Sequence, residues 1–126
     1  MTRTKISLAI FVFLVVYILF SINKIYTITT ETNILCDEIH DFVISSNWEE
    51  AHTESERLLK LWNKNSKAMF VYVNTNELDL ISCEIVKLTD YTQYKNKSEA
   101  IPCISVIKYL INEINALEKI TWHNIL

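Results

Sequence analysis

Apolar residues are distributed in two different ways along this chain. From Ile6 to Ile22 they form a run of seventeen residues without one charged side chain. After Ile28 they recur three or four residues apart, as on one face of a helix, with polar residues between them. The pattern predicts one long apolar helix followed by several amphipathic ones.

The apolar run is long enough to be a membrane span once its flanks are included. The hydrocarbon core is about 30 Å thick and a helix rises about 1.5 Å per residue, so a span from Lys5 to Tyr26 suffices. A cleaved signal peptide is the competing interpretation, but the run exceeds a usual apolar core, and no pair of small residues follows Ile22. We therefore expect an uncleaved signal anchor that contacts the lipid bilayer through Ile6 to Ile22.

Positive charge beside the run predicts its orientation. Arg3 and Lys5 precede it, and only Lys24 follows before Arg57. Because positive residues stay on the cytoplasmic side, we expect a cytoplasmic N-terminus, a single-pass protein of the cell membrane, and a C-terminal domain outside. We place the cytoplasmic N-terminus and the anchor in residues 1–27 and an extracytoplasmic helical bundle domain in residues 28–126.

The remainder of the chain is acidic and has almost no helix-breaking residues. From residue 24 to residue 126, ten Lys or Arg stand against fifteen Asp or Glu, which makes a nucleic-acid partner a poor fit. The absence of glycine and the single proline disfavour strands and tight turns. The predicted fold class is all-α: an N-terminal transmembrane helix followed by a small antiparallel bundle of three to four helices.

Helix boundaries follow from the apolar spacing and from capping residues. The first helix is expected to continue from the span to Ser45-Ser46-Asn47, where either Ser46 or Asn47 can cap a second helix. That second helix begins near Trp48 and should end in the polar run 63–66. Residues 67–94 fit one helix, with a short strand at 69–73 as the alternative, and Ser98 is the expected cap of the last helix.

Two tryptophans and three carboxylates are the candidate interaction or ligand residues. Trp48 and Trp62 share a helix, which favours packing over a ligand cage. Glu77, Asp79 and Glu84 lie close together on the third helix, and Glu77 and Glu84 share a face. Their repulsion would be relieved by a cation or by a lysine from another helix, but a solvated face is the favoured interpretation.

Catalytic, cofactor and metal sites are not predicted. Glu49-x-x-His52 resembles half of a di-iron element, but no second copy accompanies it. Cys36, Cys83 and Cys103 lack metal or redox spacing, so we expect small buried side chains, with one external disulfide left open. No nucleophile has a recognisable base beside it, so we expect no enzyme.

Several short motifs together resemble a known family. They are Trp48-x-x-Ala51 with Trp62 later in the helix, Glu77-Leu78-Asp79-x-Ile81, Lys97-Ser98-x-Ala100, and the ending Trp122-His123-Asn124-Ile125-Leu126. This pattern resembles a family of small bacterial membrane proteins, found mainly in spore-forming Gram-positive bacteria, that is named only as a domain of unknown function, DUF4363. The family often has a histidine before the Glu-Leu-Asp motif, where this chain has Asn74-Thr75-Asn76. The resemblance implies a single-pass helical protein and adds no activity.

Two kinds of function fit these expectations. The favoured one is a membrane-anchored interaction or scaffold module that presents a helical face to another membrane or envelope protein. The alternative is a sensor bundle that binds a small molecule or cation near Trp48, Trp62 and Glu77. A helix that leaves the membrane with a heptad-like apolar stripe could also pair with its own copy, which would make the protein a homo-oligomer.

Overall fold

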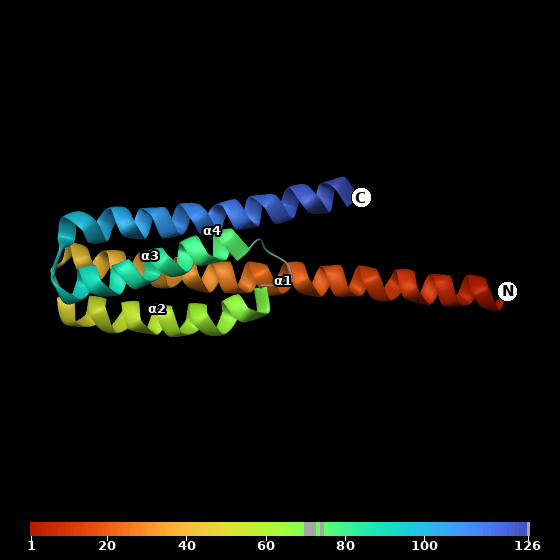
Figure 1. Cartoon of the computed structure of the whole chain (residues 1–126), viewed down its shortest axis with the longest axis horizontal. Coiled ribbons are helices and arrows are strands. Elements are labelled where there is room, and N and C mark those ends of the chain that lie inside the picture. The colour runs from red at the N-terminus through yellow and green to blue at the C-terminus, as the bar shows by residue number, and fades with distance from the viewer. Residues whose placement is uncertain (70–72, 74, 126) are drawn as a thin grey trace.

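The computed structural model describes residues 1–69, 73 and 75–125, and the surroundings of side chains as far as residue 116. Over these residues the chain forms four helices: α1 (Thr2–Ile44), α2 (Trp48–Met69), α3 (Thr75–Gln93) and α4 (Lys97–Ile125). Figure 1 shows them side by side, with successive helices running in opposite directions. The predicted all-α class is confirmed.

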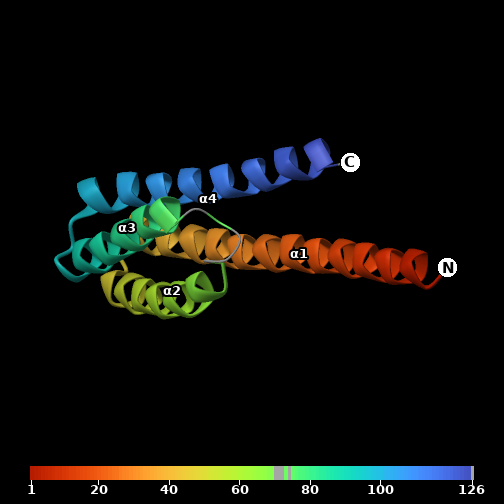
Figure 2. The ribbon, with the colours of Figure 1, turned by 45° about the vertical axis from the view of Figure 1, so that its right-hand side comes forward.

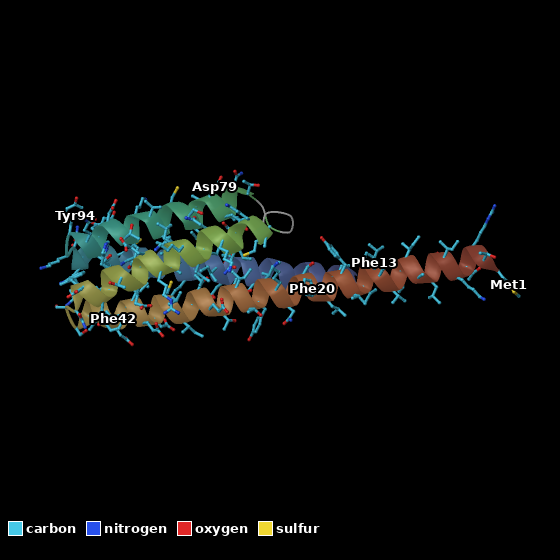
Figure 3. The ribbon with its side chains drawn as sticks, turned by 90° about the horizontal axis from the view of Figure 1, so that it is seen from below. Met1, Phe13, Phe20, Phe42, Asp79 and Tyr94 are labelled. Atoms are coloured by element: carbon cyan, nitrogen blue, oxygen red, sulfur yellow. The ribbon has the colours of Figure 1, made fainter. Side chains whose placement is uncertain are left out.

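Helix α1 has two halves with different surroundings. Residues 2–20 contain no buried side chain, whereas from Ser21 onward one face of the same helix is buried against the other helices. Figure 3 shows Phe13 and Phe20 on the part of α1 that extends past the ends of α2 and α3. Within the described residues, α1 is the one helix long and apolar enough to cross a membrane.

The core of the bundle follows a seven-residue pattern. Helix α1 packs against α2 and α4, and α3 packs against the same two helices, so the four surround one core, as the turned view in Figure 2 also shows. Buried positions alternate by three and four residues, which is the spacing of nearly parallel packed helices. The core along α2 and α3 consists of Ala51, Leu58, Trp62, Met69, Leu78, Ile81, Ile85 and Leu88.

Two similar turns join the helices at the end of the bundle far from the N-terminus. Ser46 and Lys95 have φ angles of 60° and 56°, the left-handed region that usually favours glycine. In each turn the next residue closes the preceding helix, since Asn47 N–H donates to the Phe42 carbonyl and Asn96 N–H to that of Tyr91, both at 2.8 Å. These backbone hydrogen bonds stabilise the left-handed conformation at Ser46 and Lys95, which glycine would adopt with less strain.

The helix caps differ in part from the sequence prediction. Helix α2 begins directly after Asn47, which decides between the two predicted caps. For α4 the prediction of Ser98 is wrong: the Asn96 side chain accepts a hydrogen bond from the Glu99 N–H at 3.3 Å, while Ser98 donates to the same Asn96 oxygen. Asparagine therefore starts both helices that follow a turn.

Two predicted helix boundaries are wrong. Helix α2 continues through the polar run 63–66 to Met69, which is buried. Residues 67–94 are not one helix, because 67–69 belong to α2 and α3 begins at Thr75. The alternative of a short strand at 69–73 falls largely on residues 70–72, which lie outside the described residues.

Candidate interaction surface

Trp62 lies at the centre of the bundle. Its side chain is 0% exposed, and its indole N–H donates a hydrogen bond to the Ser82 hydroxyl of α3 at 2.8 Å. Ser82 in turn donates to the Leu78 carbonyl at 3.0 Å, so the hydroxyl uses both of its functions. This arrangement fixes the pairing of α2 with α3 and agrees with the packing role expected for the tryptophan.

Trp48 is the first residue of α2. Fourteen residues separate it from Trp62, a distance of about 21 Å along a helix axis. It is half-buried, packs against the core, and borders an open depression of about 400 Å³ beside His52. His52 bonds the Thr89 carbonyl at 3.1 Å, and its other nitrogen lies 3.1 Å from Glu56. The structure does not bring the two tryptophans together.

The three carboxylates on α3 have separate surroundings. Glu84 pairs with Lys87 at 3.2 Å, so its cationic partner comes from the same helix. Asp79 is exposed at the mouth of a depression of about 300 Å³ that also includes Ser82, and Glu77 is half-buried near the start of the helix. Within the described residues, no group of three His, Cys, Asp or Glu side chains could hold a metal ion.

The cysteines are unpaired, and two of them are inaccessible. Cys36 and Cys103 are buried, whereas Cys83 is exposed, so the prediction of a buried side chain is wrong for Cys83. Burial raises the pKa of the Cys36 thiol to about 12. Burial and a hydrogen bond to Glu84 do the same for Cys103, whose Sγ lies 3.4 Å from that carboxylate. Neither buried thiol is an activated nucleophile.

Polar bonds link the helices along three of the four seams. Lys108 pairs with Asp37 between α4 and α1, and Thr29 bonds Asn115 there at 2.9 Å. His52 and Trp62 bridge α2 to α3, and Cys103 bridges α4 to α3. Between α1 and α2, by contrast, no side-chain hydrogen bond or ion pair occurs within the described residues 21–69. This seam is open.

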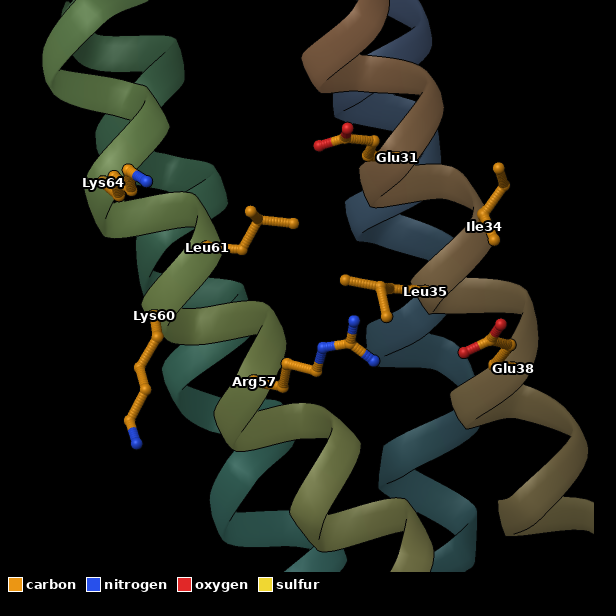
Figure 4. Close-up of a pocket in the computed structure, with 8 residues that line it drawn as sticks. All are labelled: Glu31, Ile34, Leu35, Glu38, Arg57, Lys60, Leu61 and Lys64. Atoms are coloured by element: carbon orange, nitrogen blue, oxygen red, sulfur yellow. The ribbon is translucent and has the colours of Figure 1, made fainter.

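A groove of about 570 Å³ runs along the α1–α2 seam. Leu35 and Leu61 form its floor, and Ile34, which is 54% exposed, lies at its edge. The walls carry opposite charge, as Figure 4 shows: the α1 wall holds two carboxylates and the α2 wall three cations. The lining residues are Glu31, Ile34, Leu35, Glu38, Arg57, Lys60, Leu61 and Lys64.

The charged groups of the groove are incompletely paired. Arg57 reaches between the helices toward Leu35 and Glu38 in Figure 4, but its ion pair, at 3.5 Å, is with Glu54 of its own helix. We refer to the groove residues Glu31 and Glu38 as the acidic wall, and to Arg57, Lys60 and Lys64 as the basic wall. No residue of either wall was a candidate from the sequence analysis. In the sequence, however, the two acidic residues and the three basic residues already lie on separate helices.

Comparison with known proteins places the chain in a family. The pattern described as Domain of unknown function (DUF4363) matches residues 19–125. The chain belongs to the DUF4363 family. The match begins inside the apolar half of α1, so the DUF4363 pattern includes the junction between the two halves as well as the whole groove. No curated protein and no solved structure matches the DUF4363 chain.

Proposed function

We propose that this protein is a single-pass membrane protein whose helical bundle lies outside the cell membrane and serves as an interaction or scaffold module. The observation that carries the proposal is the continuity of α1. One unbroken helix passes from a half with no buried side chains into a half packed in the bundle. Such a helix would hold the bundle directly at the bilayer surface.

The exposed half of α1 has the properties of a lipid-facing helix. Phe13 and Phe20 are 72% and 64% exposed, and most of the other residues of the run are aliphatic. An apolar surface of this extent is unfavourable in water, and a bilayer would cover it. The expected span from Lys5 to Tyr26 would extend about 33 Å as a helix, enough for the hydrocarbon core. Its last residues, from Ser21 onward, are the ones with which α1 begins to pack in the bundle.

Charge at the two ends of this segment supports the orientation. Arg3 and Lys5 lie before it, and Lys24 alone lies near its other end. Positive residues favour the cytoplasmic side, so the N-terminus would be cytoplasmic and the bundle external.

The interior and the surface of the bundle favour an interaction role over catalysis or ligand binding. Trp62 fills the centre, and the depressions described above are open to solvent. The alternative, a small-molecule or cation sensor, would need Trp48, Trp62 and Glu77 around one cavity, and the first two lie at opposite parts of α2. The groove, with an apolar floor and charged walls, offers a surface of the kind that protein partners bind.

Site-specific crosslinking in cells tests this function. A photo-crosslinking residue at Ile34, beside the groove, should capture a defined protein in the membrane fraction, whereas the same residue at exposed Val86 on α3 serves as the matched control. If both positions capture the same mixture, the groove is not an interaction surface. Stabilisation of the purified protein by a small ligand, together with no specific capture, would favour the sensor instead.

A further inference from the structure

The charges on α1 and on the second half of α2 are of opposite sign. Between residues 25 and 44, α1 has four acidic residues and no lysine or arginine. Between residues 57 and 67, α2 has one arginine, three lysines and no acidic residue. The first half of α2 carries four glutamates, at positions 49, 50, 54 and 56. Since the two helices are neighbours, the acidic α1 lies beside the basic second half of α2.

The walls of the groove are also matched in height. Figure 4 shows Glu31 at the level of Lys64 and Glu38 at the level of Arg57. Glu31 and Glu38 are seven residues apart, and so are Arg57 and Lys64, a spacing of about 10.5 Å along a helix. The groove therefore has two levels, each with a negative group on one side and a positive group on the other.

We propose that this groove is the interface between two copies of the chain, related by a twofold axis parallel to the helices. The inference rests on the proposed membrane anchor, because two copies inserted in the same direction can pair only side by side and parallel. Such a rotation places α1 of one copy opposite α2 of the other at the same height. Each acidic wall then faces a basic wall, so the surface is complementary to itself, as a twofold interface requires.

The open seam and the membrane both support this occupant. Across the other seams, polar or charged side chains already form hydrogen bonds or ion pairs between helices of the same chain. Across the α1–α2 seam, the acidic wall forms no ion pair within the described residues. The exposed side chain of Ile34 would be covered by the partner copy. Confinement to one bilayer raises the effective concentration of the copies, so individually weak surface pairs can suffice.

Two charge-reversed variants of the full chain test the proposal. Glu31→Lys with Glu38→Arg makes both walls basic. Arg57→Glu with Lys64→Glu places a carboxylate on both walls at each level and leaves Lys60 as the one remaining cation among the wall residues. The control, Asp79→Lys with Asp90→Arg, makes the same change of charge as the first variant, but on the exposed surface of α3. Each protein is reconstituted in phosphatidylcholine vesicles, and association is measured by energy transfer between dyes attached at Cys83.

The wild type and the control should form dimers, and each groove variant alone should associate at least about tenfold more weakly, because like charges then face each other. An equimolar mixture of the two groove variants should regain the association of the wild type. Pairing of the walls within one chain cannot produce that recovery. Helical content by circular dichroism verifies that each variant is folded.

A wild type that is incorporated in vesicles but stays monomeric would overturn the proposed dimer and leave the membrane anchor standing. Dimers that tolerate both groove variants would show a different interface, and a folded mixture that stays monomeric would assign the wall charges to pairing within one chain. A chain that does not float with the vesicles would contradict the anchor itself, and with it the parallel geometry. The two proposals therefore fail in distinguishable ways.

Discussion

Replacement of Trp62 should be the most destabilising change in the bundle. The side chain is fully buried, and its N–H is bonded to Ser82 at 2.8 Å. Trp62→Ala removes the indole and leaves a cavity, which should lower the free energy of unfolding by about 3–5 kcal/mol. Since small domains are stable by only about 5–15 kcal/mol, this is a large share of the total.

Two matched variants separate packing from hydrogen bonding. Trp62→Phe keeps an aromatic ring and loses the N–H donor, so it should cost about 1–2 kcal/mol. Ser82 keeps its own bond to the Leu78 carbonyl in that variant. Trp48→Ala, at the half-buried end of the same helix, should cost about 1 kcal/mol.

Urea titration of the full chain in detergent micelles, followed by far-ultraviolet circular dichroism, measures all three values without relying on tryptophan fluorescence. Equal slopes of the transitions would show that the variants differ in stability alone. The reasoning is refuted if Trp62→Ala costs less than about 1 kcal/mol, or if Trp48→Ala costs as much as Trp62→Ala.

Further predictions concern the thiols and the turns. At neutral pH a maleimide should modify Cys83 in the folded protein and modify Cys36 and Cys103 only after unfolding, as mass spectrometry of the labelled peptides would show; equal labelling would contradict their burial. Because the folded-state pKa of Cys36 is raised from 9.0 to about 12, its contribution to stability is complete below pH 9 and is lost as the pH rises toward 12, so the decline in stability should be smaller in Cys36→Ala. Asn96→Ala should cost about 1 kcal/mol in thermal or urea unfolding, and Asn96→Asp should restore most of it. Lys95→Gly should stabilise the protein by about 1 kcal/mol, since glycine has no steric penalty at a φ of 56°, and a loss of stability would show that the turn is not left-handed.

The helices themselves were predictable because apolar spacing reports the buried face directly. Leu78, Ile81 and Ile85 are three and four residues apart in the sequence, and all three are buried on one face of α3. The turn at 45–47 was also predictable, since its serines and asparagine interrupt that spacing. These signals are local, so the sequence alone suffices to find them.

Helix ends were harder to predict because polar composition alone does not stop a helix. The run 63–66 contains neither glycine nor proline, Asn63 and Lys64 point outward, and Met69 supplies a further core contact. The tertiary contact outweighs the weak helix preference of the asparagines.

The residues of the candidate site were harder still to predict, because they depend on contacts between helices. Glu84 could be recognised as a carboxylate that needs a cation, but its partner is Lys87 of the same helix rather than a lysine from another helix. The groove depends on which helices are neighbours and at what height, and neither follows from the spacing within one helix. The segregated charges of α1 and α2 were nevertheless visible in the sequence, and they acquire meaning once the two helices are seen side by side.

The native thiol at Cys83 gives the most direct test of the membrane-anchored bundle, because it is exposed while the other two cysteines are buried. Sealed right-side-out membrane vesicles from cells that express the full chain are treated with a membrane-impermeant maleimide, before or after permeabilisation. The account predicts an intact chain that resists alkaline extraction from the membrane and is labelled at Cys83 without permeabilisation. Labelling only after permeabilisation, or a chain released in soluble form, would contradict it.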